Sequence, residues 1–290
     1  MINRIKSELL NLGLKFIDVD EKIVRMFLET KPDHVNDIVI LPTVKAVMKK
    51  LVNKLDGKNK QGKVYNGIIN GIRVSIIQCH VGAPNMAIMI ESLRRTKAKK
   101  IIRVDFCGGV SGLSSNINIG DVIIPNATYC GDGTSPQYIL KFPGLSTRFG
   151  SVSNPISRFQ SLIAGCPEIF ITTPHEDLTN TLFKEGRKLY PKNLKKVDLW
   201  TTDALFCETT DFLNAMRAIN VEAIDMESSV MFLLGKQYNL ETSAILAVSD
   251  LPGTEYDLLE TNEIHPDMEN GIDRAIQTLV KSLPQIKNLM

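Results

Sequence analysis

Short runs of apolar and β-branched residues recur along the chain and are separated by polar or glycine-rich segments. Runs of this length between turn signals are typical of strands that are buried in a sheet. The strands predicted in this way cover residues 36–42, 99–109, 120–130 and 241–250. Residues 63–82 differ, because two β-branched runs flank Asn70-Gly71, the dipeptide that favours a two-residue hairpin turn. The pattern therefore predicts a sheet that includes one hairpin.

Apolar residues three or four positions apart predict helices between these strands. The predicted helices cover residues 83–98, about 176–190, about 209–219 and about 267–285. Residues 222–238 predict a strand that passes directly into a helix. Residues 131–170 are rich in glycine, proline and serine, and we expect them to form an elaborated loop region. Strands that alternate with helices indicate a mostly parallel sheet covered on both faces.

The first residues of the chain stand apart from this alternation. Residues 1–34 place apolar and charged positions at helical spacing until Pro32 ends the pattern, and we expect them to form a helical extension. Residues 35–290 are expected to form one domain, since open α/β sheets of this size are ordinary. The predicted fold class is α/β: a single domain whose central mixed, mostly parallel β-sheet is flanked by helices.

Composition and charge exclude several classes of protein. Hydrophobic residues make up 43% of the chain, which is enough for a large core. The net charge is only +2, so nothing in it favours nucleic acid or an anionic membrane as a partner. The five cysteines lack CxxC spacing and the four histidines lack metal-ligand spacing, so we expect no metal site. Without the apolar run of a signal peptide or a membrane helix, we expect a cytoplasmic protein.

Two carboxylates interrupt the apolar segment at residues 222–238. Asp225 and Glu227 flank Met226 where the predicted strand meets the predicted helix. Burying carboxylates costs free energy unless something pairs with them. One explanation is helix capping, with Asp225 as N-cap and Glu227 in the first turn. The other is a ligand site, in which a carboxylate accepts hydrogen bonds from a polyol or stabilises a cation.

Polar residues also follow other predicted strands at their carboxyl ends. Arg103 precedes a glycine-containing strand end, and Asp250 ends the strand 241–250. Ligands of α/β sheets bind beyond the carboxyl ends of the strands, so we expect these residues and Glu227 to line one crevice. The sequence contains no GxGxxG, GxxxxGK[ST] or GxSxG loop, which disfavours dinucleotide, nucleoside triphosphate and serine hydrolase sites.

Cleavage of an N-glycosidic bond suits this set of side chains. Its transition state has oxocarbenium character, which a nearby carboxylate stabilises. Glu227 matches the two donors of a ribose diol, and Asp250 matches a general acid for the departing base if burial raises its pKa. Arg103 matches a bidentate phosphate contact. The structural alternatives are an ion pair of Arg103 with Asp105 and a capping role for Asp250.

Four segments together resemble a known family. "IIRVDFCGGV", "GDVIIPNA", "IDMESS" and "AVSD", in that order, are similar to the nucleoside phosphorylase-I family, which includes purine nucleoside phosphorylases, uridine phosphorylases and several nucleosidases. The resemblance extends from about Asn36 to Leu283. It implies a phosphorylase/hydrolase-like fold, a homo-oligomer (dimer, trimer or hexamer), and inorganic phosphate as co-substrate without any cofactor.

The resemblance also implies roles for individual residues. Asp250 and Glu227 are the expected catalytic residues, protonating the purine at N7 and bonding the ribose hydroxyls. Phe206 or Leu205 is expected to lie against the base. The expected substrate-binding residues are Thr43, Lys45, His80, Val81, Gly82, Arg103, Phe106, Cys107, Gly108, Phe206, Asp225, Met226 and Ser249.

The sequence departs from the family pattern at the phosphate end of the site. Thr43 occupies the position of an expected glycine, and Lys45 is the nearest cation in place of a loop arginine. Phe106 replaces a serine that helps to bind phosphate, and the arginine expected after Asp250 is missing.

Three functions therefore remain open at the level of the sequence. The first is phosphorolysis of a purine nucleoside to the free base and ribose 1-phosphate. The second is hydrolysis of a nucleoside or a nucleoside 5′-monophosphate, as in AMP nucleosidase. The third is non-catalytic binding of a nucleoside. Uridine remains an alternative substrate because "DGTSPQY" (residues 132–138) resembles a loop of uridine-type members.

Overall fold

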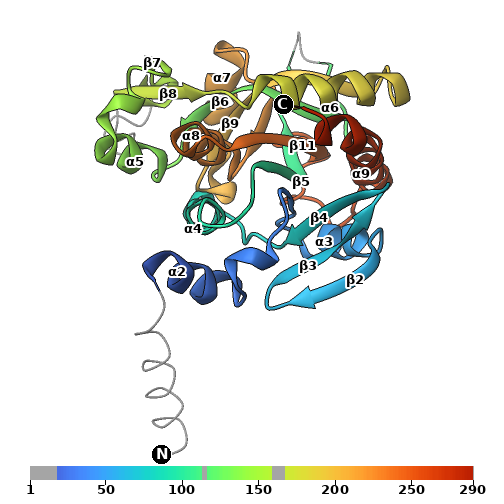
Figure 1. The fold of residues 1–290 in the computed structure, drawn as a ribbon. Coiled ribbons are helices and arrows are strands. Elements are labelled where there is room, and N and C mark those ends of the chain that lie inside the picture. The colour runs from blue at the N-terminus through green and yellow to red at the C-terminus, as the bar shows by residue number, and fades with distance from the viewer. Residues whose placement is uncertain (1–17, 113–115, 159–166, 290) are drawn as a thin grey trace, which may run out of the picture.

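The computed structural model describes residues 18–112, 116–158 and 167–289 (Figure 1). Its strands are β1 (Ile38–Leu41), β2 (Asp56–Gln61), β3 (Val64–Ile69), β4 (Ile72–Ile77), β5 (Lys100–Gly109), β6 (Val122–Gly131), β7 (Gly150–Ser153), β8 (Glu168–Thr172), β9 (Leu194–Thr202), β10 (Ala223–Asp225) and β11 (Glu241–Asp250). Its helices are α2 (Val19–Leu28), α3 (Lys45–Val52), α4 (Ala83–Leu93), α5 (Ser135–Lys141), α6 (Glu176–Leu189), α7 (Thr210–Ala218), α8 (Ser228–Tyr238) and α9 (Pro266–Lys287).

The strands form one mixed sheet whose centre closes on itself. Strand β5 pairs with both β10 and β11, and the ring β5-β10-β9-β6-β11 returns to β5. Parallel pairings join β4, β1, β5 and β11, and also β10, β9 and β6. Antiparallel pairings close the ring and add the outer strands. The predicted α/β domain with a mixed sheet flanked by helices is confirmed.

The predicted hairpin forms between β3 and β4. Asn70 and Gly71 both have positive φ angles, 49° and 77°, as a tight two-residue turn requires. A second turn joins β2 to β3 at Gly62, where a Cβ atom would overlap the backbone of Glu29 at the end of α2. Glycine at this turn therefore lets the hairpin pack closely against α2.

Three clusters of apolar side chains cover the sheet. One joins the sheet to α2, α4 and α8, a second joins it to α3, α6 and α9, and a third joins it to α7. Helix α2 packs against α4, and its residues Val24 and Leu28 are fully buried (Figure 1). The described part of the predicted N-terminal extension is thus helical, and residues 1–17 lie outside the described residues. The division of the chain at residue 35 stays a prediction.

Several elements differ from the sequence-based expectation. Residues 131–170 hold α5, β7 and the start of β8 rather than loops alone, and β7 and β8 extend the sheet beyond β6. Strand β9 is not predicted because Lys195-Lys196 interrupts its apolar pattern. Strand β2 is not predicted because it is polar throughout and lies at an edge of the sheet. Within the described ranges, no helix has both the length and the apolar character needed to cross a membrane.

Candidate active site

A cavity of about 180 Å³ lies where the carboxyl ends of β5, β10 and β11 meet the loop after β1. It is lined by Thr43, Val44, Val81, Arg103, Asp105, Phe106, Cys107, Gly108, Leu205, Glu208, Ile224, Asp225, Met226, Glu227, Ser249, Asp250 and Leu258. Most of the site residues expected from the sequence therefore meet at one place. The exceptions are Lys45, His80, Gly82 and Phe206.

The exceptions differ in where they lie. Lys45 and His80 line a neighbouring cavity. Gly82 contacts the site through its backbone, since its N–H donates to Glu227 Oε1 at 2.8 Å. Phe206 is 82% exposed and does not line the cavity, whereas Leu205 does. The expectation that places Phe206 in the site is therefore not supported by this geometry, because the short turn Leu205–Cys207 directs only Leu205 toward the cavity.

Arg103 is buried between two carboxylates. It is 2% exposed, its Nη1 lies 2.7 Å from Asp225 Oδ2, and its Nη2 donates to Glu227 Oε2. The antiparallel pairing of β10 with β5 brings Asp225 back alongside Arg103. The ion pair that the sequence suggests for Arg103 is real, but its partners are the site carboxylates rather than Asp105.

Asp225 accepts four hydrogen bonds from within the protein. Its oxygens accept hydrogen bonds from Thr201 Oγ1 at 2.7 Å, Ser228 N at 3.0 Å, Ser228 Oγ at 2.5 Å, and Arg103. A carboxylate offers about two lone-pair positions on each oxygen, and three of these donors converge on Oδ2, whereas Oδ1 accepts only from Thr201. The bond to Ser228 N satisfies a backbone N–H at the start of α8. The N-cap position, however, is Glu227 rather than Asp225, and the Glu227 side chain makes no capping hydrogen bond, so the expected arrangement of the cap is wrong.

Glu227 lies in the same cluster as Asp225 but accepts fewer hydrogen bonds. The structure gives its carboxylate two donors, Gly82 N and Arg103 Nη2. About two of its four lone-pair positions therefore stay open to the hydroxyl groups of a ligand. Asp225 thus accepts four hydrogen bonds from the protein and Glu227 two, so Glu227 has the larger open acceptor capacity.

Burial, together with the charges of neighbouring groups, shifts the pKa values in this cluster. Burial would lower the pKa of Arg103, but the charges of Glu227, Asp225 and Asp105 outweigh it and raise the pKa. Burial raises the pKa of Glu227, and the charge of Arg103 opposes this shift. Arg103 therefore stays charged and limits the cost of burying Glu227.

Asp105 holds the loop between β1 and α3. It accepts hydrogen bonds from the backbone N–H groups of Thr43, Val44 at 3.0 Å and Phe106 at 2.9 Å. Thr43 Oγ1 and Arg103 Nε are buried without a hydrogen-bond partner among the described residues. Both residues line the cavity, where a polar or anionic group of a ligand would supply the missing acceptors.

Asp250 lies at the other end of the cavity. A register shift after Val248 ends β11 with a bulge, and such bulges redirect side chains at strand ends. Ser249 Oγ lies within hydrogen-bonding distance of both Cys107 O and Asp250 Oδ1. Burial raises the pKa of Asp250, which favours a protonated carboxyl group.

Glu208 lines the cavity beside Asp250 and is not identified by the sequence analysis. Burial, together with the charges of Asp250 and Asp257, raises the pKa of Glu208 to about 8. The residue follows a short turn rather than a patterned strand or helix, so no sequence signal marks it. Within the described residues, no cluster of three or more histidine, cysteine or acidic side chains has an arrangement that could hold a metal ion.

The fold is thus a closed mixed α/β sheet that carries a strand-end cavity with carboxylates at both of its ends. The sequence model described as "Phosphorylase superfamily" matches residues 37–284, so the chain belongs to that superfamily. The resemblance inferred from the four segments is thereby confirmed.

Individual relatives are distant. The chain is 20% identical over 256 residues to a guanosine phosphorylase of Halorubrum lacusprofundi, covering 86% of this chain and 93% of the relative. It is 25% identical over 263 residues to a uridine phosphorylase of Treponema pallidum, covering 86% and 90%. The structure of a purine nucleoside phosphorylase from Toxoplasma gondii has a TM-score of 0.66 at 19% identity, covering 90% of this chain and 95% of that one. This structural similarity concerns the fold.

Proposed function

We propose that the protein is a nucleoside phosphorylase that cleaves the N-glycosidic bond of a purine nucleoside with inorganic phosphate. The observation that carries this proposal is the pair of open acceptor positions on Glu227, in a cavity that also holds Asp250. Relatives named as guanosine and uridine phosphorylases support the same class of reaction. A cytoplasmic homo-oligomer that uses no cofactor belongs to this proposal.

Each residue has a defined role in the proposed reaction. Glu227 accepts hydrogen bonds from the ribose hydroxyls, and its negative charge stabilises the oxocarbenium-like transition state. The bond between C1′ and the purine nitrogen breaks, a phosphate oxygen forms a bond to C1′, and Asp250 transfers its proton to purine N7. The products are the free base and ribose 1-phosphate. The raised pKa of Asp250 supports its role as the acid.

The phosphate end of the cavity supports the reaction less directly. Thr43 Oγ1 and Arg103 Nε are the buried donors without partners among the described residues, and both residues line the cavity. They are the proposed contacts of the phosphate. Lys45 is not among the lining residues, so the loop cation expected from the sequence is not part of this contact.

Hydrolysis is the second candidate function. Arg103 already neutralises two carboxylates, and it is the only basic residue among the described residues that line the cavity. A site with so little net positive charge binds phosphate weakly, and water would then be the attacking group. Uridine remains an alternative substrate within the proposal. Binding without catalysis is the least supported alternative, because Glu227 and Asp250 both line the cavity.

A substrate panel tests the proposed function. Purine and pyrimidine nucleosides and their 5′-monophosphates are each incubated with and without high concentrations of inorganic phosphate, and the sugar product is identified. We expect cleavage of a purine nucleoside that depends on phosphate and yields ribose 1-phosphate. Free ribose formed at a rate indifferent to phosphate would replace the proposal with hydrolysis. If no nucleoside is cleaved while one still protects the protein against heat, only the binding function would remain.

A further inference from the structure

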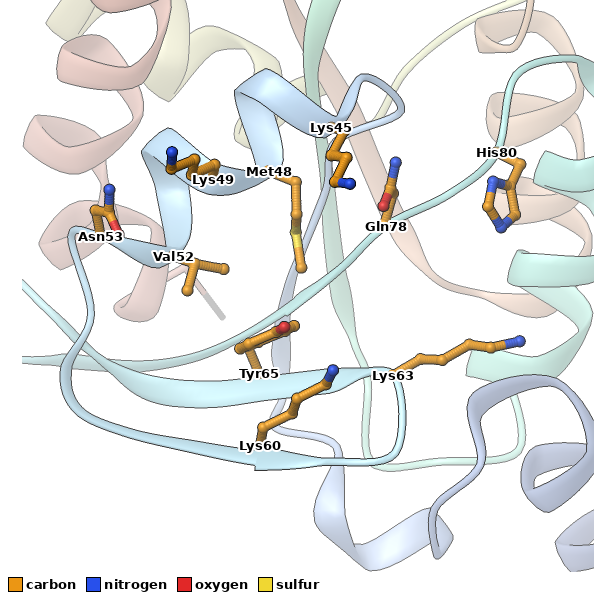
Figure 2. Close-up of a pocket in the computed structure, with 10 residues that line it drawn as sticks. All are labelled: Lys45, Met48, Lys49, Val52, Asn53, Lys60, Lys63, Tyr65, Gln78 and His80. Atoms are coloured by element: carbon orange, nitrogen blue, oxygen red, sulfur yellow. The ribbon is translucent and has the colours of Figure 1, made fainter.

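A second cavity, of about 430 Å³, lies between α3 and the hairpin of β2 and β3, as Figure 2 shows. Its lining residues are Lys45, Met48, Lys49, Val52, Asn53, Lys60, Lys63, Tyr65, Gln78 and His80. We name it the lysine cavity. Its volume falls within the range of about 300–1,000 Å³ that is usual for small-molecule sites, whereas a bare inorganic ion needs far less room.

The positive charge of the lysine cavity is not neutralised by the described residues that line it. Four of its ten lining residues are lysines, and none of the described residues that line it is acidic. Lys63 Nζ lies 3.4 Å from Glu29 Oε1, and Glu29 does not line the cavity. In the described part of the chain, no ion pair involves Lys45, Lys49 or Lys60. These unpaired charges repel one another and favour an anionic ligand.

Helix α3 itself provides a contrast. Lys50, which does not line the cavity, pairs with Glu269 at 2.9 Å and Asp273 at 2.8 Å. Its neighbour Lys49 lines the cavity from α3 and has no such partner among the described residues (Figure 2). Lys50, outside the cavity, is therefore paired with carboxylates, whereas Lys49, which lines the cavity, remains available to a ligand.

The other half of the lysine cavity is apolar. Met48 and Val52 on α3 line it, and both are largely buried. The Tyr65 ring faces them from β3, with Lys60 Nζ 4.9 Å from the ring centroid (Figure 2). Cations beside an apolar wall suit a phosphate group that is attached to an organic body, with the phosphate near the ammonium groups and the body against Tyr65.

The lysine cavity also shares a wall with the candidate active site. Thr43 and Val44 line the active-site cavity, and Lys45 lines the lysine cavity. Gln78, which lines the lysine cavity, stabilises this shared segment, because its Nε2 donates a hydrogen bond to Thr43 O at 2.9 Å. In the segment after β4, His80 lines the lysine cavity and Val81 lines the active-site cavity.

From these observations we propose that the lysine cavity binds a phosphate monoester, of which a nucleoside 5′-monophosphate is the representative. The proposal goes beyond the proposed function and does not depend on which bond the neighbouring site cleaves, because binding in this cavity can be measured without turnover. If phosphorolysis fails while lysine-dependent binding is found, only the proposed function falls.

Isothermal titration calorimetry of the full-length protein at low salt tests the proposal, with AMP as the probe. The variant Lys49→Met/Lys60→Met removes two charges from the cavity. The control variant Lys54→Met/Lys58→Met removes the same charge from exposed positions of neighbouring segments that do not line it. Both lysines are exposed, so solvent screens their charges, and we expect the cavity variant to weaken the AMP Kd by roughly 3- to 30-fold. The control should stay near the wild-type value.

Two further ligands distinguish the source of the phosphate. Adenosine should bind all three proteins equally, because it carries no phosphate. Inorganic phosphate should bind more weakly than AMP, because it lacks the body that contacts Tyr65. The same AMP affinity in the cavity variant and the control variant would overturn the proposal. Equal affinities of the wild-type protein for inorganic phosphate and AMP would also overturn it, leaving a site for the bare ion.

Discussion

Both ends of the candidate active site carry carboxyl side chains, but the charges around these side chains differ. At one end, Asp225 and Glu227 share the buried guanidinium of Arg103. At the other, Asp250 and Glu208 have no cation among the described residues that line that end, and burial raises the pKa of both. A nearby cation favours a charged carboxylate, and its absence favours a protonated one. Burial raises the pKa of Glu227 as well, but the charge of Arg103 opposes that shift, whereas no cation among the described lining residues opposes it at Asp250 and Glu208. This difference distinguishes a stabilising carboxylate from an acid.

The largest expected effect comes from removing the shared cation. Arg103→Met leaves two buried carboxylates without a counter-charge, and breaking a buried ion pair in this way costs about 3–5 kcal/mol. We expect urea denaturation to show a loss of this size in the free energy of unfolding. The loss should shrink as the pH falls, because protonation then removes the uncompensated charges.

A partly exposed ion pair supplies the control for this prediction. Arg94 pairs with Glu91 at 2.7 Å, with 31% of the arginine side chain exposed. Arg94→Met should cost no more than about 1 kcal/mol, as exposed pairs do. Equal losses in the two variants would mean that Arg103 is not compensating buried charge.

Substitutions of the two carboxylates beside Arg103 should affect stability and activity to different extents. Glu227→Gln keeps an acceptor for Gly82 N but removes the charge, so we expect turnover to fall by roughly 10²–10³-fold, the range for losing one group that stabilises the transition state. The variant should remain folded. Steady-state kinetics together with a thermal melt measure both effects.

Asp225→Asn is the matched comparison for Glu227→Gln. An asparagine oxygen cannot accept all four of the present hydrogen bonds, and each donor left unsatisfied costs about 1–3 kcal/mol. Stability should therefore fall more than it does in Glu227→Gln. A stable but inactive Asp225→Asn protein would instead place Asp225 in contact with the substrate.

The smallest expected effect concerns pH. Below pH 8 the Glu208 carboxyl is mostly protonated and can donate a hydrogen bond to the base, and above pH 8 it is charged and cannot. The wild-type kcat/KM should therefore decline above about pH 8, in line with the pKa of Glu208. Glu208→Gln remains neutral and should lose this step from the pH profile. Identical profiles for the two proteins would remove Glu208 from recognition of the base.

Local patterns in the sequence predict local structure well. Asn70-Gly71 forms the hairpin turn because two residues suffice to set its geometry. The carboxyl ends of β5 and β11 converge because their parallel pairing follows from the alternation of strands and helices. The positions of Arg103 and Asp250 in one cavity could therefore be predicted.

Other features depend on pairings that no local pattern records. Strand β10 runs antiparallel to β5, and this direction gives Arg103 its two carboxylate partners. The choice of Leu205 over Phe206 and the burial of Glu208 both depend on how a short turn packs. The lysine cavity requires α3 and the β2–β3 hairpin to face each other, and the all-polar sequence of β2 does not predict a strand.

The difference between the two ends of the site is tested most directly by the leaving-group dependence of Asp250→Asn. The account predicts that kcat/KM falls by roughly 10²–10⁴-fold for a natural purine nucleoside, the usual range for losing a general acid. For a nucleoside whose base leaves readily without protonation, the variant should retain nearly the wild-type rate. An equal loss for both substrates would contradict the account, because Asp250 would then position the substrate rather than protonate the departing base.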